Sequence, residues 1–116
     1  MPVIKTHAST PIPENARTAL KTAYGSAIEA IPGKSEQWLM CLFDECASIY
    51  FAGDDTQPSA LIEVGVFARG EVPAAAWDAL TAEVTQSVTQ TLGIDPSRIY
   101  VSCSSTPSFG WNGSTF

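Results

Sequence analysis

A proline stands second in the chain, in the run Met1-Pro2-Val3-Ile4, at the front of an apolar stretch typical of a strand. If Met1 is retained, the Pro2 nitrogen is a tertiary amide and chemically inert. If Met1 is removed, the chain begins with a secondary amine. Such an amine can act as a base near neutral pH where burial and a nearby cation disfavour its charged form. Proline at this position is common and indicates nothing by itself, so its interpretation depends on the rest of the chain.

The other reactive side chains are few. Cys41 and Cys103 lie within apolar runs and fit small buried hydrophobes. With Cys46 they form neither a C-x-x-C pair nor a zinc-ligand spacing. His7 is the only histidine, which excludes a metal site built from several histidines and favours a packing or surface role. We therefore expect neither a metal nor another cofactor.

Length and charge narrow the class of protein. The 116 residues fit a single domain, residues 1–116, with a modest core. A formal net charge of −6 and a pI near 4.5 disfavour a nucleic-acid partner, although one well-placed Lys or Arg can hold a small anion. No apolar run reaches the roughly 20 residues of a membrane span, and no signal-peptide pattern is present. We expect a cytoplasmic protein with no membrane partner, with leaderless secretion as an alternative.

The chain repeats one β-α-β plan. Strands are predicted at 2–8, 37–43, 60–67 and 99–103, and helices at 13–31 and 71–92. Pro13 suits the first position of a helix, and Pro32-Gly33 and Gly93 suit helix ends. A helix between two strands of one sheet makes those strands parallel with a right-handed crossover. The prediction is an α/β (α+β) fold, with a four-stranded mixed sheet and two helices on one face.

This arrangement leaves the other sheet face without a helix. Because residues alternate along the strands, we expect that face to carry apolar side chains such as Leu39, Cys41, Ile62, Val64 and Tyr100. An uncovered apolar sheet face usually needs a partner, so the pattern predicts an oligomer.

Polar segments separate and follow the two halves. Loops are predicted at 53–58 and 104–108, and the tail at 109–116 has aromatic residues on both sides of Asn112-Gly113, a strong tight-turn signal. We expect a short C-terminal hairpin suited to docking onto a neighbouring subunit.

Four features in matching order span essentially the whole chain: Pro2, Gly33-Lys34, the stretch 95–100 (Asp-Pro-Ser-Arg-Ile-Tyr) and the tail 110–116 (Gly-Trp-Asn-Gly-Ser-Thr-Phe). Together they resemble the macrophage migration inhibitory factor family of the tautomerase superfamily, with the tail as the most specific part. The resemblance implies a homotrimer of β-α-β-β-α-β subunits, with sheets lining a central barrel and active sites at subunit boundaries. It also implies keto–enol tautomerase activity on aromatic α-keto acids such as phenylpyruvate, and on dopachrome-type substrates.

The resemblance also assigns roles to residues. Pro2, freed of Met1, is the base, and Lys34 holds the substrate carboxylate rather than being a solvated loop lysine. Phe67 is the apolar residue whose backbone contacts substrate. Phe109 and Trp111 form the aromatic wall, and Tyr100 reaches in from the adjacent subunit. For these four aromatics, core packing is the alternative role.

Two positions depart from the family pattern. Ser102 stands where the family has a substrate-binding asparagine, and its shorter side chain puts that hydrogen bond in question. Residues 59–62 (Ser-Ala-Leu-Ile) replace a C-x-x-C motif, so thiol–disulfide exchange is not expected.

Other functions stay open at this stage. One is a secreted, cytokine-like protein that binds a receptor, as in some members of the family. Another is hydration or dehalogenation of an unsaturated acid. That reaction needs a further acid to activate water, and Glu63 is the one candidate, although an exposed sheet edge suits it better.

Overall fold

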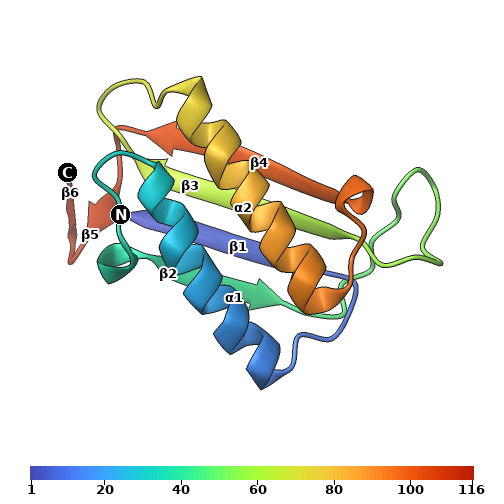
Figure 1. The fold of residues 1–116 in the computed structure, drawn as a ribbon. Coiled ribbons are helices and arrows are strands. Elements are labelled where there is room, and N and C mark those ends of the chain that lie inside the picture. Colours follow the sequence, from blue (N-terminus) through green and yellow to red (C-terminus); the bar gives the residue numbers. More distant parts are fainter.

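The computed structural model describes residues 1–116 and contains a mixed sheet of four strands in the order β2-β1-β3-β4 (Figure 1). Strands β1 and β2 are parallel, β3 and β4 are parallel, and β1 is antiparallel to β3. The strands are β1 (Pro2–Ala8), β2 (Met40–Asp44), β3 (Ala60–Phe67) and β4 (Ile99–Thr106). The predicted duplication and mixed sheet are confirmed.

Helices α1 (Glu14–Ala27) and α2 (Ala74–Leu92) lie side by side across one face of the sheet (Figure 1). Pro13 is the N-cap of α1 rather than its first helical residue. A 3-10 turn, η1 (Ile28–Ala30), continues α1. Helix α2 ends at Gly93, whose φ of 70° is the left-handed conformation that glycine adopts without strain. No helix has the length and apolar character required to cross a membrane.

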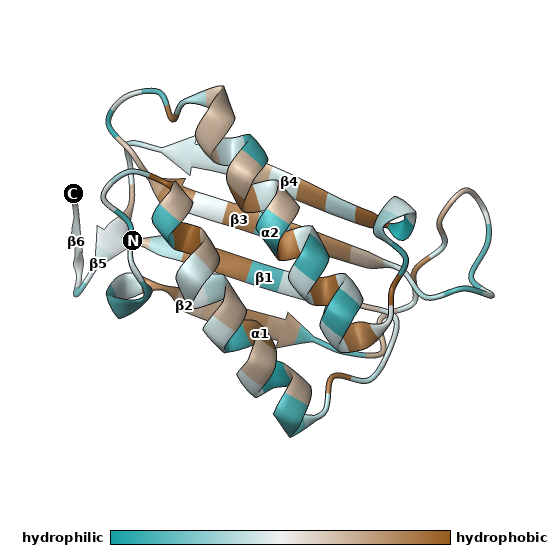
Figure 2. Cartoon of the chain, viewed as in Figure 1, coloured by the Kyte–Doolittle hydropathy of each residue, from teal (hydrophilic) through white to brown (hydrophobic).

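The core lies between the sheet and the two helices. Apolar residues alternate with more polar ones along β1, β3 and β4 (Figure 2). Within this core, the Tyr24 hydroxyl lies 2.6 Å from Thr6 Oγ1, so both buried hydroxyls have a partner. Burial raises the pKa of Tyr24 to about 12. The largest buried side chains include Ile4, Leu20, Tyr24, Ile28, Ile62 and Leu80.

The predicted composition of the open face is largely wrong. Ile62 and Val64 are fully buried beneath the helices, and Leu39 and Cys41 pack against the same core. Of the side chains expected there, Tyr100 alone is exposed. Because side chains alternate between faces, the open face carries the other set, with Met40, Leu42 and Leu61 among polar Lys5, His7 and Glu63.

Two strand boundaries also differ from the prediction. Residues Glu36–Trp38 form a 3-10 turn, η2, so β2 begins at Met40 rather than at position 37. Strand β4 continues to Thr106, because Ser104–Thr106 pair with Gly65–Phe67 and thereby satisfy their backbone groups. The predicted tail hairpin is confirmed as β5 (Gly110–Trp111) and β6 (Ser114–Thr115). Its turn has φ values of 51° at Asn112 and 85° at Gly113.

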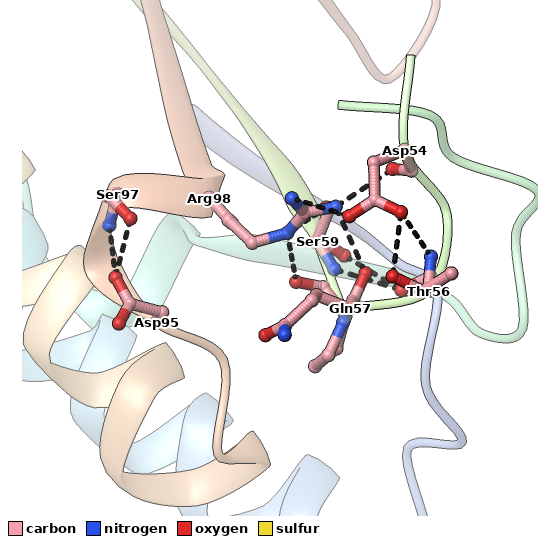
Figure 3. Close-up of polar contacts among 9 residues, drawn as sticks. Asp54, Thr56, Gln57, Ser59, Asp95, Ser97 and Arg98 are labelled. Carbon is pink, nitrogen blue, oxygen red and sulfur yellow. Dashed lines mark hydrogen bonds and ion pairs between the residues drawn. The ribbon is translucent and has the colours of Figure 1, made fainter. Parts of the chain in front are cut away.

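Arg98 donates hydrogen bonds to the loop that joins the two β-α-β units (Figure 3). It closes the 3-10 turn η3 (Pro96–Arg98), which begins with Asp95 accepting a 2.9 Å hydrogen bond from Ser97 N–H. Arg98 Nε donates to the Pro58 carbonyl at 3.0 Å, and Nη2 donates to the carbonyls of Asp54 at 2.9 Å and Gln57 at 3.1 Å. The stretch 95–98 that carried part of the resemblance therefore has a structural role.

Candidate active site

Pro2 lies buried at the start of β1, at the end of the sheet where the amino terminus meets the C-terminal hairpin (Figure 1). It pairs with Val66 of β3 on one side, and its neighbour Val3 pairs with Met40 of β2 on the other. The Phe67 N–H donates to the Met1 carbonyl at 3.1 Å. The backbone at the amino terminus is therefore fixed by two neighbouring strands.

A pocket of about 400 Å³ opens beside this strand end. Its walls come from three separate segments: the start of β1, the η2 turn with the start of β2, and the tail. Trp38 and Trp111 meet edge to face with ring centroids 5.4 Å apart. The lining is mainly apolar, and includes Pro2, Trp38, Met40, Phe109 and Trp111. Such a pocket suits the ring of an aromatic ligand.

The amino group at this position is already perturbed. The pKa of the Met1 amine lies below its usual range, first because burial disfavours the charged form and second because the Lys34 ammonium is nearby. Lys34 follows Gly33, whose φ of 77° turns the chain back after η1. Lys34 is therefore the nearby cation that acts electrostatically on the amino terminus.

Lys34 and Phe67 line an adjoining recess of about 240 Å³ rather than the Trp-lined pocket itself. Lys34 Nζ is 5.5 Å from the centroid of the Phe67 ring, and Arg69 Cζ is also 5.5 Å from it. The Phe67 ring then contacts Phe116 edge to face at 5.6 Å. The ring centroids of Phe116 and Trp111 are in turn 6.4 Å apart. A row of aromatic rings therefore connects the recess at Lys34 with the Trp-lined pocket.

The sequence did not predict a role at the site for three of these neighbours, which are Trp38, Phe116 and Arg69. Trp38 was interpreted as part of a strand, although it follows the Lys34 turn closely enough to have suggested a role beside it. Phe116 was assigned to the tail without a partner, and its N–H closes the hairpin by donating to the Phe109 carbonyl at 2.9 Å. Arg69 is the second residue after Phe67, the last residue of β3, and a cation so close to a strand end was the available signal.

Tyr100 and Ser102 do not reach Pro2 within one chain. Tyr100 is opposite Leu61 on β3, whereas Pro2 is opposite Val66, five residues further along. At the usual strand rise this separation is roughly 16 Å. Tyr100 is 65% exposed, and its ring packs against Phe51 at 5.3 Å, at the far end of the sheet.

Ser102 lines a third recess, of about 260 Å³, on the open sheet face. It pairs with Glu63 in the sheet register, and Lys5 lies in the same recess. Phe109 lines both this recess and the Trp-lined pocket, so the two are neighbours. A single chain thus brings Pro2, Phe109 and Trp111 together, with Lys34 and Phe67 beside them.

His7 and Glu63 form an ion-paired cluster on the open face. His7 Nδ1 is 3.0 Å from Asp44 Oδ2 and Nε2 is 2.7 Å from Glu63 Oε2, so the imidazole bridges β2 and β3. Strand β3 is central, and the expectation that Glu63 lies at a sheet edge is wrong. With its oxygen held by His7, three register positions from Pro2, Glu63 is not placed to activate water at the candidate site.

The His7 cluster predicts a pH dependence of stability. Hydrogen bonds that His7 donates to the carboxylates of Asp44 and then Glu63 raise the pKa of His7 in the folded chain, with only Lys5 as a further charged neighbour on the same face of β1. The resulting stabilisation is complete below the unfolded pKa of about 6.5 and is lost as pH rises through the raised folded pKa. The melting temperature of wild type minus that of His7→Gln should therefore fall as pH rises above about 6.5. A constant difference would contradict this role.

Burial raises the pKa of the Cys41 and Cys103 thiols, which fits their expected packing role. No cluster of three or more His, Cys, Asp or Glu side chains is arranged to hold a metal ion.

Known proteins with this fold were found by comparison of structures. No family model and no curated protein matches the chain in sequence. The crystal structure of Leishmania major MIF2 is similar over 100% of this chain and 97% of its own, with 33% identity and a TM-score of 0.90. A macrophage migration inhibitory factor homologue from Prochlorococcus marinus covers 98% of each chain, with 29% identity and a TM-score of 0.84. A fused 4-OT described as a symmetric trimer covers 97% of this chain and 94% of its own; at 24% identity and a TM-score of 0.82, it shows the shared fold alone.

Proposed function

The chain belongs to the macrophage migration inhibitory factor family, and from that premise we propose that it is a keto–enol tautomerase of aromatic α-keto acids such as phenylpyruvate, with dopachrome-type compounds as further substrates. Pro2, exposed as a secondary amine by removal of Met1, is the general base. Lys34 holds the substrate carboxylate. The reaction needs no cofactor, because tautomerisation only moves a proton.

The observation that carries this proposal is the environment of the amino terminus. Burial and the Lys34 charge lower the pKa of an amine at this strand end. Pro2, one residue further into the strand, is itself buried and pairs with Val66 of β3. A neutral amine at physiological pH has a free electron pair and can accept a proton, which is the first requirement of a general base.

The proposed reaction has two proton transfers. The neutral Pro2 nitrogen takes a proton from the carbon next to the keto group, and the electron pair of that C–H bond moves to give an enolate. The resulting ammonium returns the proton to the enolate oxygen, which yields the enol; the reverse direction restores the ketone. The aromatic ring of the substrate lies against Trp38, Phe109 and Trp111, in the pocket of about 400 Å³.

The complete site in this proposal lies between subunits of a homotrimer. Large apolar side chains on and beside the open face are exposed, among them Met40 (63%), Leu42 (44%) and Tyr100 (65%). Burial of this surface against another copy would favour assembly. Tyr100 and Ser102, which do not reach Pro2 in their own chain, are then available to the site of the adjacent subunit.

The proposed activity is tested by enol–keto conversion of phenylpyruvate. Intact mass first establishes that Met1 has been removed, and the rate is then compared between the processed protein and its Pro2→Gly variant. Equal rates in the two proteins would contradict the proposal.

Lys34→Gln should weaken substrate binding and shift the pH profile. Loss of a charge-assisted hydrogen bond to the carboxylate should raise KM for phenylpyruvate about tenfold. Because the Lys34 charge lowers the pKa of the amine, its removal should also move the acid limb of kcat/KM to higher pH. Lys21→Gln, on the exposed side of α1, removes the same charge and is the control. An unchanged KM and acid limb in Lys34→Gln would exclude this role.

A further inference from the structure

Arg69 differs from the other two arginines of the chain in having no oxygen partner. Arg17 Nη1 donates to the Ile12 carbonyl at 2.7 Å, and Arg98 donates to several oxygens of the loop between the two halves. The guanidinium of Arg69 makes no hydrogen bond or ion pair, and its Cζ instead lies 5.5 Å from the centroid of the Phe67 ring. Its N–H donors are therefore free for a ligand.

A second unpaired cation faces the same ring. Lys34 Nζ also lies 5.5 Å from the Phe67 centroid, and neither Lys34 nor Arg69 takes part in an ion pair. Glu71 lines the same recess of about 240 Å³ without pairing with either of them. Two of the six basic residues of a chain with net charge −6 thus line one small recess, and with Glu71 as its one carboxylate the recess has a net positive charge.

We propose that Arg69 is a second anion-binding residue of this site, and that the site prefers α-keto acids carrying two carboxylates. Lys34 holds the carboxylate next to the keto group, and the planar guanidinium of Arg69 binds the second carboxylate with two parallel N–H···O bonds. The inference rests on the proposed function only in assigning the keto acid to this site. The preference for two carboxylates comes from the two unpaired cations.

The test is a binding measurement that requires no turnover. Fumarate and crotonate are both trans-unsaturated four-carbon acids. Fumarate has a second carboxylate at the position where crotonate has a methyl group. Calorimetry on the Met1-processed protein should give a Kd for fumarate about tenfold lower than that for crotonate. In Arg69→Gln, fumarate binding should fall to the level of crotonate, and crotonate binding should be unchanged.

Two further variants distinguish a specific contact of Arg69 from a general effect of removing a positive charge. Lys34→Gln should weaken both ligands, because both carry the first carboxylate. Arg17→Gln removes an equal charge from α1 and should bind both ligands as the wild type does. Equal affinities for the two ligands in the wild type, absence of fumarate binding, or an equal loss in Arg69→Gln and Arg17→Gln would each overturn the proposal. If Pro2→Gly does not change the tautomerase rate, the proposed function is contradicted, but the binding results for Arg69 are not affected.

Discussion

A chain that keeps a residue in front of Pro2 is expected to lose about 10²–10⁴-fold in kcat/KM for phenylpyruvate relative to the Met1-processed chain, the usual contribution of a general base. The reason is chemical, because an acylated Pro2 nitrogen is an amide and has no basic electron pair. Pro2→Gly should lose about 10²-fold, at the lower end of that range. It keeps an amine, but exchanges a ring with fixed φ for a flexible residue, and so loses the orientation of the nitrogen.

The matched comparison uses one sequence in two states. A chain with a short N-terminal extension and the processed chain are purified in parallel, intact mass identifies the first residue, and the melting temperature of each establishes that both are folded. Wild-type activity in the extended chain would show that Pro2 is not the base. A matching loss of activity and of melting temperature would assign the effect to folding instead.

Much of the fold could be predicted because local signals and tertiary structure agree. Strands 2–8 and 60–67 were predicted with the bounds that β1 and β3 have, and Gly93 ends α2 as expected. The failure at 37–39 has a local cause: Trp38 and Leu39 continue the apolar run of β2, and short apolar runs do not distinguish a strand from a 3-10 turn.

The error about sheet faces has a different cause. Alternation divides β3 into two sets of side chains but does not say which set faces the helices. One set contains Ala60, Ile62, Val64 and Val66, and the other contains Glu63 and Gly65 between Leu61 and Phe67. The carboxylate and the glycine mark the second set as the poorer core, so the sequence did contain a signal for the correct choice.

The candidate site could be predicted only where its parts come from one chain. Pro2, Phe109 and Trp111 do line one pocket. A single chain leaves Tyr100 and Ser102 on its open face, and only the proposed homotrimer would bring them to the site of another copy. Arg69 and Trp38 carried no motif, and their position beside the site follows from how β3 and η2 end rather than from spacing along the sequence.

Arg98→Ala is expected to lower the free energy of unfolding by about 3 kcal/mol, which is a fall of roughly 10 °C in melting temperature for a chain of this size. The side chain is only 13% exposed and each of its nitrogens donates to an oxygen of residues 54–59 (Figure 3). Truncation leaves the carbonyls of Asp54, Gln57 and Pro58 without that donor. Thermal unfolding followed by circular dichroism measures the loss.

The ion pair is the smaller part of this effect. Arg98 Nη1 and Asp54 Oδ2 are 3.5 Å apart and the Asp54 side chain is 41% exposed, a geometry in which an ion pair contributes little to stability. Asp54→Asn, which keeps an acceptor oxygen, should therefore change stability little, and Arg98→Lys should recover only part of the loss because an ammonium cannot reproduce the guanidinium fork. Arg17→Ala removes an arginine with a single carbonyl contact and should cost about 1 kcal/mol. If Arg98→Ala costs no more than Arg17→Ala, the loop between the two halves holds its conformation without Arg98.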